Sequence, residues 1–139
     1  MTELEARQNS IKDLFNTFIN NDDKWKYLLQ LANNNQHIDN YDDKFLVQGC
    51  STQIYLIPEY KDDKLYFKCD SKVGGLLSLG LCIFAANLYS GLSPKEILDS
   101  DFSFFNEIGF YNGLTPTRNN GFASILAKIK YFAILNYKL

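Results

Sequence analysis

The run LLSLGLCIFAANLY, from Leu76 to Tyr89, is the most apolar stretch of the chain and limits how the chain can fold. It is too short to span a bilayer, and it contains the small or polar residues Ser78, Gly80 and Asn87. We therefore predict a buried helix and a soluble protein. Because the N-terminal stretch MTELEARQNSIKDLF lacks an apolar h-region, we expect no signal peptide. These features favour the cytoplasm, or an organelle stroma or matrix if the chain is a processed mature domain.

Apolar residues at helical spacing flank a central region of strand-like composition. Helical periodicity occurs between residues 11 and 32 and again between residues 73 and 133. The runs between them, Lys44–Gln48, Gln53–Ile57 and Leu65–Cys69, are rich in β-branched and aromatic residues, and Pro58 ends the second run. Since helices and strands do not alternate, the sequence predicts an α+β fold, a small three-stranded antiparallel sheet covered by helices. The length of 139 residues favours a single domain over residues 1–139.

The charge and the cysteine content exclude several classes of protein. A net charge of −2 with scattered basic residues does not fit a nucleic-acid-binding surface. An odd number of cysteines, three, without a secretion signal favours a reducing compartment and no disulfide framework. Cys50, Cys69, Cys82 and His37 do not form the closely spaced pairs that structural zinc sites use, so we predict no metal site. We interpret His37 as a solvated loop residue rather than a catalytic partner of Cys50.

Cys50 lies in LVQGCSTQIYL, between a glycine and a strand-like run. Gly49 lets the backbone turn sharply, and the small polar residues after the cysteine are not typical of a core. An isolated cysteine is more often a buried hydrophobic residue than a nucleophile. Its neighbours instead place this thiol at a strand edge or loop tip, where functional groups concentrate. Arg118, in LTPTRNNG, falls at the start of the predicted last helix and forms either a surface ion pair or a cation beside an anionic sulfur.

Several segments occur in the order that is typical of one family: VQGCSTQIYL, FKCDS, GL at 80–81, YSGLSPKEIL and LTPTRNNG. On these segments the chain resembles the SufE family, the sulfur-acceptor partners of cysteine desulfurases, from about Trp25 to Ala133. The resemblance implies a compact α+β domain similar to the IscU-type scaffold. It also implies that Cys50 accepts a persulfide sulfur from a SufS-like cysteine desulfurase that carries pyridoxal phosphate. Proteins of this family stimulate that enzyme and pass the sulfur to an iron–sulfur cluster scaffold.

The same resemblance implies roles for further residues. Arg118 belongs to the family's motif and would stabilise the thiolate or persulfide, or contact the partner. Contact with the desulfurase is implied for the residues around the cysteine and for one acidic residue: Gly49, Ser51, Thr52, Gln53 and Asp70. The chain would bind no cofactor and no metal of its own, and would contact neither nucleic acid nor membrane. It would act as an accessory sulfur carrier, a monomer or weak dimer, rather than as a self-contained enzyme.

Two further expectations follow from this chemistry. A second accessible thiol would displace a persulfide and form a disulfide, so we expect Cys69 and Cys82 to be buried. The alternative function is an IscU-type iron–sulfur or zinc scaffold, which needs three converging cysteine ligands. The position of Cys82 in the middle of an apolar helix argues against it. Lys72, Leu79 and Gly113 depart from the family's usual pattern, which leaves the matching desulfurase open.

Overall fold

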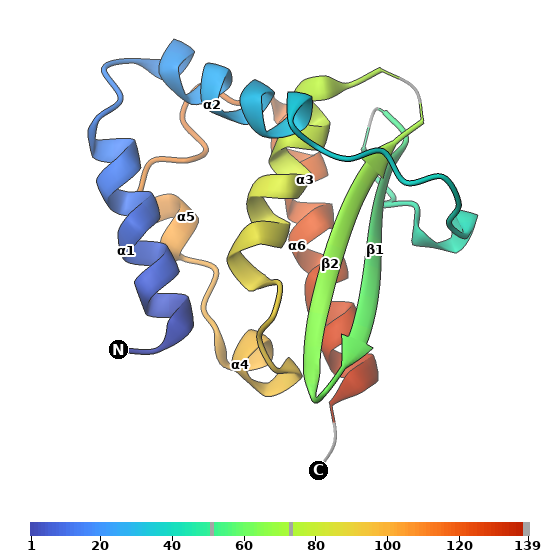
Figure 1. Cartoon of the computed structure of the whole chain (residues 1–139). Helices are drawn as coiled ribbons and strands as arrows, with labels where there is room; N and C mark the ends of the chain where they lie inside the picture. The colour runs from blue at the N-terminus through green and yellow to red at the C-terminus, as the bar shows by residue number, and fades with distance from the viewer. Residues whose placement is uncertain (51, 73, 138–139) are drawn as a thin grey trace.

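The computed structural model describes residues 1–50, 52–72 and 74–137, and its elements follow the predicted order of helices, strands and helices. They are α1 (Glu3–Asn16), α2 (Asn21–Asn33), the 3-10 turn η1 (Asp43–Phe45), β1 (Ile54–Lys61), β2 (Lys64–Ser71), α3 (Leu76–Tyr89), α4 (Pro94–Asp99), α5 (Phe104–Glu107) and α6 (Pro116–Asn136). Helices and strands do not alternate along the chain, so the α+β prediction is confirmed (Figure 1).

Helix α3 is the buried centre of the molecule. Every residue from Leu79 to Ala86 is buried, because the helix is apolar around its whole circumference. It contacts α1 and α2 on one side and β1, β2 and α6 on the other (Figure 1). The apolar run therefore forms the predicted buried helix. No helix in the described part of the chain is long and apolar enough to cross a membrane.

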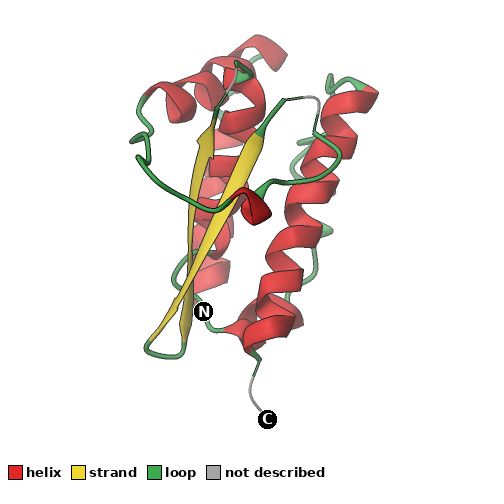
Figure 2. Cartoon of the chain, turned by 90° about the vertical axis from the view of Figure 1, so that its right-hand side faces the viewer, coloured by secondary structure: helices red, strands yellow, loops and turns green. Residues whose placement is uncertain are grey.

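The sheet is a single antiparallel hairpin of β1 and β2, in register from Ile54 opposite Ser71 to Lys61 opposite Lys64 (Figure 2). The connecting residues Asp62 and Asp63 both have positive φ, of 52° and 62°. This conformation is typical of a tight hairpin turn whose twist matches that of the strands. The hairpin packs with one face against α3 and α6.

The predicted first strand, Lys44–Gln48, was wrong, and the described residues form two strands rather than three. The Asp42 side chain accepts a hydrogen bond of 2.8 Å from the Lys44 backbone N–H and so starts η1 instead of an extended segment. Only the end of the run reaches the sheet. Val47 donates a 2.8 Å hydrogen bond to the Ile54 carbonyl, and a single bridge pairs Leu46 with Tyr55.

The second strand continues through Pro58 to Lys61, whereas the sequence predicted that Pro58 would end it. Pro58 lies opposite Phe67, and the Phe67 N–H points out of the hairpin to the Ser90 hydroxyl at 3.0 Å. This is therefore a pair without mutual hydrogen bonds, so the missing N–H of proline removes no bond from the ladder.

A buried lysine holds the segment that leads into α6. Lys24 on α2 is 4% exposed, and its ammonium group donates to the carbonyl oxygens of Phe110, at 2.9 Å, and of Asn112. Burial lowers its pKa. Helix α6 then starts as predicted, with the Thr115 hydroxyl accepting from the Arg118 N–H and Pro116 in the first turn. The hydrogen bonds of Lys24 thereby fix the segment before α6 relative to α2.

Candidate functional site

Cys50 lies in the short segment between Val47 and β1, and this segment runs directly against α6. Gly49 has φ of +90°, in the left-handed region that favours glycine. A Cβ atom added there would lie 2.7 Å from the Ser124 hydroxyl oxygen on α6. A side chain at this position would therefore displace the Ser124 hydroxyl. The glycine before the cysteine thus serves both the turn and the close approach.

The Cys50 thiol fits into a notch in α6 made by Gly121. Its sulfur lies 3.8 Å from the Gly121 carbonyl oxygen, to which the S–H donates. A Cβ atom on Gly121 would lie at a contact distance of 3.4 Å from the sulfur, so the thiol packs directly against α6 at this residue. Cys50 is half-buried in this position. The expectation of a thiol at a loop, next to a strand, agrees with this placement.

A small cavity of about 10 Å³ adjoins the thiol between α3 and α6. This is close to the space that one water molecule needs. Its lining residues come from the cysteine loop, α3 and α6: Cys50, Ser78, Leu81, Thr117, Arg118, Gly121 and Ile125. A larger cleft of about 340 Å³ lies alongside and shares Ser78, Thr117 and Arg118 with it. Arg118 therefore lies where the cleft meets the cavity of the thiol.

Burial controls the protonation state of the thiol. It raises the pKa of Cys50 from an ordinary 9.0 to about 11, and the neighbouring Cys82 thiol adds a smaller upward shift. We expected that Arg118 would lower this pKa. Arg118 does line the cavity, but its side chain belongs to an exposed residue, and desolvation of the sulfur is the largest effect. At neutral pH the resting thiol is therefore protonated and a poor nucleophile.

Alkylation of Cys50 in the folded protein should show this raised pKa. The rate with iodoacetamide is expected to keep rising above pH 9 and to level off only near pH 11, since the thiolate is the reactive form. Folding favours the protonated thiol, so this contribution to stability is present below pH 9 and is lost as pH rises through about 11. The measurement is the alkylation rate against pH, with urea-unfolded protein as the control, which should level off near pH 9. A midpoint at or below 9 in the folded protein would contradict the buried placement.

The residues predicted to contact a partner lie in different environments. Gly49 and Thr52 flank the site, and Gln53 is exposed at the start of β1. Ser51 falls outside the described residues. The Thr52 hydroxyl is buried against Gly75 and has no hydrogen-bond partner among the described atoms. The loop thus packs on the N-terminus of α3 as well as on α6.

Asp70, the remaining predicted contact residue, is buried at 4% exposure. One carboxylate oxygen lies 2.9 Å from the His37 Nδ1 and accepts a hydrogen bond of 2.9 Å from the Ile38 N–H. The other accepts from the Ser71 N–H at 2.8 Å. These bonds fasten the segment after α2 to the end of β2. Asp70 lies in β2 opposite Tyr55, and its internal partners occupy both of its carboxylate oxygens.

Sequence reasoning missed the residues that shape the notch and the cavity. Gly121 is the last residue of the LTPTRNNG segment, but no pattern in the sequence indicates that the Cys50 thiol packs against it. Ser78, Leu81 and Ile125 belong to helical faces that periodicity assigns only to packing. Their contribution depends on how α3 crosses α6, which no local pattern reveals.

The other two cysteines are buried, as expected, with Cys69 at 4% exposure and Cys82 at 0%. Their sulfur atoms lie 3.0 Å from each other. Within residues 1–50, 52–72 and 74–137, no three His, Cys, Asp or Glu side chains gather as the ligands of a metal ion would. The convergence of three cysteines that the scaffold alternative needs is therefore not found among these residues.

Comparison with known proteins shows the family to which the chain belongs. Residues 9–133 match the family model described as SufE: Fe-S metabolism associated domain. The chain belongs to the SufE family. It is 33% identical over 138 residues to the cysteine desulfuration protein SufE of Wigglesworthia glossinidia brevipalpis, covering 94% of this chain and 91% of that protein. The SufE family is associated with iron–sulfur metabolism, as its description states.

Two further similarities bear on the length and the fold. The chain is 34% identical over 88 residues to an uncharacterized SufE-like protein of Synechocystis, and it spans about half of that protein, 54%. The solution structure of a hypothetical protein from Thermus thermophilus aligns with a TM-score of 0.72 at 16% identity, covering 93% of this chain and 94% of the other. This second similarity shows that the two chains share a fold.

Proposed function

We propose that the protein accepts a sulfur atom on Cys50 from a cysteine desulfurase, stimulates that enzyme, and passes the sulfur on for iron–sulfur cluster assembly. The observation that carries the proposal is a single half-buried thiol in a glycine-led loop, seated against α6 next to Arg118. Relatives from Wigglesworthia and Plasmodium falciparum are named cysteine desulfuration protein SufE, which supports the same role. Pyridoxal phosphate would belong to the desulfurase, and this chain would supply only the acceptor thiol.

The proposed step is a displacement at sulfur. The Cys50 thiolate attacks the outer sulfur of the desulfurase persulfide, a new S–S bond forms, and the bond inside the donor persulfide breaks. The donor cysteine leaves as a thiolate and takes up the proton that Cys50 has lost. One sulfur atom moves and no external oxidant or reductant is consumed. Cys50 then carries a persulfide.

The resting geometry requires the cysteine loop to move before this step. A cavity of about 10 Å³ has no room for a donor cysteine, and the raised pKa keeps the thiol protonated. Gly49, with its positive φ, lies at the base of the segment and allows the backbone to change direction. Withdrawal of the sulfur from the notch would remove the desolvation that raises its pKa. The thiol would then become a better nucleophile at the moment of contact with the donor.

Arg118 would act on the sulfur in the partly open site. Arg118 is an exposed residue at the junction of the cavity and the cleft, and from there it would stabilise a negative sulfur or contact the desulfurase. The exposed loop residues beside the thiol, such as Gln53, would contribute to the same contact surface. The proposal assigns no such contact to the carboxylate of Asp70, which is occupied internally.

Removal of the Arg118 charge is expected to slow sulfur uptake. Arg118→Gln should lower the rate about tenfold, equivalent to about one unit in the pKa of the sulfur, without lowering the thermal midpoint, because the residue is exposed. The measurement is the initial rate of persulfide formation with a SufS-like desulfurase. Lys128→Gln removes a positive charge from the same helix farther from the cavity and is the matched control. Equal rates for both variants and the wild type would remove Arg118 from the mechanism.

The proposed function is tested by mass spectrometry after incubation with a SufS-like cysteine desulfurase and free cysteine. The expected result is a gain of one sulfur atom, located by peptide mapping on Cys50 and removed by a reductant. A reaction without free cysteine is the control. Absence of any gain, under conditions in which the desulfurase is active, would refute the role as sulfur acceptor.

A further inference from the structure

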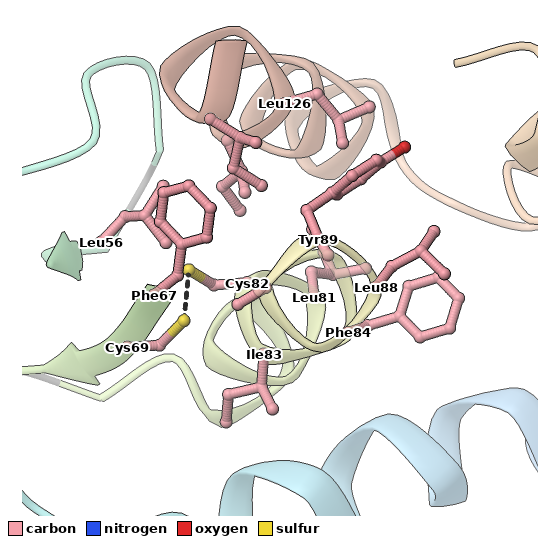
Figure 3. Close-up of a cluster of buried hydrophobic side chains, with 14 of the residues drawn as sticks. Leu56, Phe67, Cys69, Leu81, Cys82, Ile83, Phe84, Leu88, Tyr89 and Leu126 are labelled. Carbon is pink, nitrogen blue, oxygen red and sulfur yellow. Dashed lines mark hydrogen bonds between the residues drawn. The ribbon is translucent and has the colours of Figure 1, made fainter. Parts of the chain in front are cut away.

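Two cysteines that the proposed function does not use lie in contact inside the core. Cys69 comes from β2 and Cys82 from α3, 13 positions later in the chain, and the Cys82 S–H donates to the Cys69 sulfur at 3.0 Å. Figure 3 shows the two side chains pointing toward one another from the strand and the helix. Both are free thiols. Their contact is therefore a dithiol built between two elements, not a chance proximity at a surface.

The packing around the pair holds the sulfur atoms close to bonding geometry. Cys69 is fixed in the hairpin by pairing with Leu56, and β2 packs directly on α3. A disulfide has an S–S length of about 2.05 Å, so closing the bond needs the sulfur atoms to approach by only about 1 Å. Small adjustments of two side chains supply such a movement. Neither element has to leave its place in the core.

Small reagents have a route to one member of the pair. Cys69 lines a cleft of about 440 Å³ between the segment after α2, β2 and α3. The other lining residues are Asn34, Asn35, Gln36, His37, Ile38, Phe67, Lys68, Ile83, Ala86 and Asn87. Cys82 is fully buried behind Cys69. An oxidant in the cleft therefore meets the Cys69 side of the pair first.

We propose that Cys69 and Cys82 form an oxidisable dithiol that closes to a disulfide between β2 and α3, with Cys50 remaining a separate thiol. The oxidant is a hydroperoxide. It transfers one oxygen atom to the Cys69 thiol, which becomes a sulfenic acid, and the peroxide leaves as an alcohol or as water. The Cys82 thiol then attacks the Cys69 sulfur, the S–S bond forms, and water leaves. The two thiols supply the two electrons that reduce the O–O bond.

This modification uses two thiols other than the proposed acceptor, although the Cys82 thiol lies near enough to Cys50 to raise its pKa. The disulfide would link β2 to α3 across residues 70–81. This segment includes Ser78 and Leu81, which line the cavity beside Cys50. A cross-link over a loop of this length restricts the unfolded chain and stabilises the folded one. The oxidised protein should therefore unfold at a temperature about 5–10 °C higher than the reduced protein.

The test uses the Cys50→Ser variant, in which Cys69 and Cys82 are the only cysteines. The folded variant is treated with hydrogen peroxide, quenched, unfolded and alkylated with iodoacetamide. The expected intact mass shows the loss of two hydrogen atoms and no alkyl group. Reduction before alkylation should restore two alkyl groups per chain. Two alkyl groups without reduction, or stable oxygen adducts in place of the disulfide, would overturn the proposal.

Single alanine substitutions at Cys69 or Cys82 in the same background are the controls, and each should keep one thiol that alkylates after peroxide treatment. If these buried substitutions prevent folding, the wild-type chain gives the deciding measurement. Peptide mapping of peroxide-treated wild type should find a Cys69–Cys82 cross-linked peptide and an uncrosslinked Cys50. A cross-link from Cys50 to either buried cysteine as the main product would also refute the assignment.

Discussion

Replacement of Cys50 by serine is expected to abolish sulfur acceptance completely while leaving the fold intact. The hydroxyl that replaces the thiol fits the same notch beside the Gly121 carbonyl but cannot carry a transferable sulfur. The other thiols offer no substitute because Cys69 and Cys82 are 4% and 0% exposed. The measurement pairs mass spectrometry after incubation with a desulfurase and free cysteine with the rate of sulfide release by the enzyme. The variant should gain no sulfur and give no stimulation.

A Cys69→Ala variant is the matched control, since it removes a thiol without touching the loop that carries Cys50. It should still gain one sulfur atom. Unfolding curves of wild type and Cys50→Ser should have similar midpoints, which separates loss of chemistry from loss of structure. Full stimulation of the desulfurase by Cys50→Ser would rule out the covalent mechanism, even if the two proteins still bind.

The Gly80→Ala substitution is expected to lower the free energy of unfolding by about 2–3 kcal/mol. Gly80 is the point at which α3 crosses α2, and a Cβ atom there would overlap the Leu28 carbonyl, lying 2.8 Å from its carbon atom. The obstacle is backbone, so the two helices must separate. An alanine in a helix would by itself gain about 1 kcal/mol over glycine. The expected loss therefore means that overpacking exceeds the gain in helix propensity.

Gly121→Ala makes the same substitution in a buried position of α6 and is the matched control. Its Cβ would lie at an ordinary contact distance of 3.4 Å from the Cys50 sulfur, with no backbone of another helix in the way. It should leave stability unchanged or raise it slightly. The measurement is chemical unfolding in urea for both variants. Equal stabilities would show that the crossing at Gly80 relaxes without cost.

The sequence predicted those parts of the fold that depend on local periodicity. The apolar run ending at Tyr89 became the buried α3, and the predicted last helix, α6, starts at Pro116. The run Lys44–Gln48 failed because β-branched and aromatic composition does not distinguish a strand from a short turn that buries the same side chains. The capping hydrogen bond from the Lys44 N–H to Asp42 decided between them. The prediction that Pro58 ends a strand was wrong because the sequence does not show the pairing register. Only the register shows which backbone N–H groups form hydrogen bonds between the two strands.

For the candidate site, the sequence identified Cys50 and Arg118 but not the arrangement that joins them. Both line one cavity, together with residues of α3. The prediction of a loop cysteine rested on Gly49, and the structure gives that glycine a second use in the approach to Ser124. The burial of Asp70 depends on the segment after α2 crossing the end of β2. Contacts between segments that are far apart in the sequence cannot be predicted from local residue spacing.

The Gly121 notch has a consequence for which sulfur donors the protein can use. With a pKa of about 11, Cys50 is ionised at pH 7 in only about one molecule in ten thousand. A small persulfide in free solution offers no surface to hold the loop in an open conformation, so it should load the protein slowly. A desulfurase that binds around the cysteine loop can form new contacts with the opened loop. These contacts compensate for those that the Cys50 sulfur loses when it leaves Gly121. Under the proposed function, the resting position of the Cys50 sulfur against Gly121 thus favours a protein donor over a small-molecule donor. The same position slows oxidation of the thiol when no desulfurase is bound.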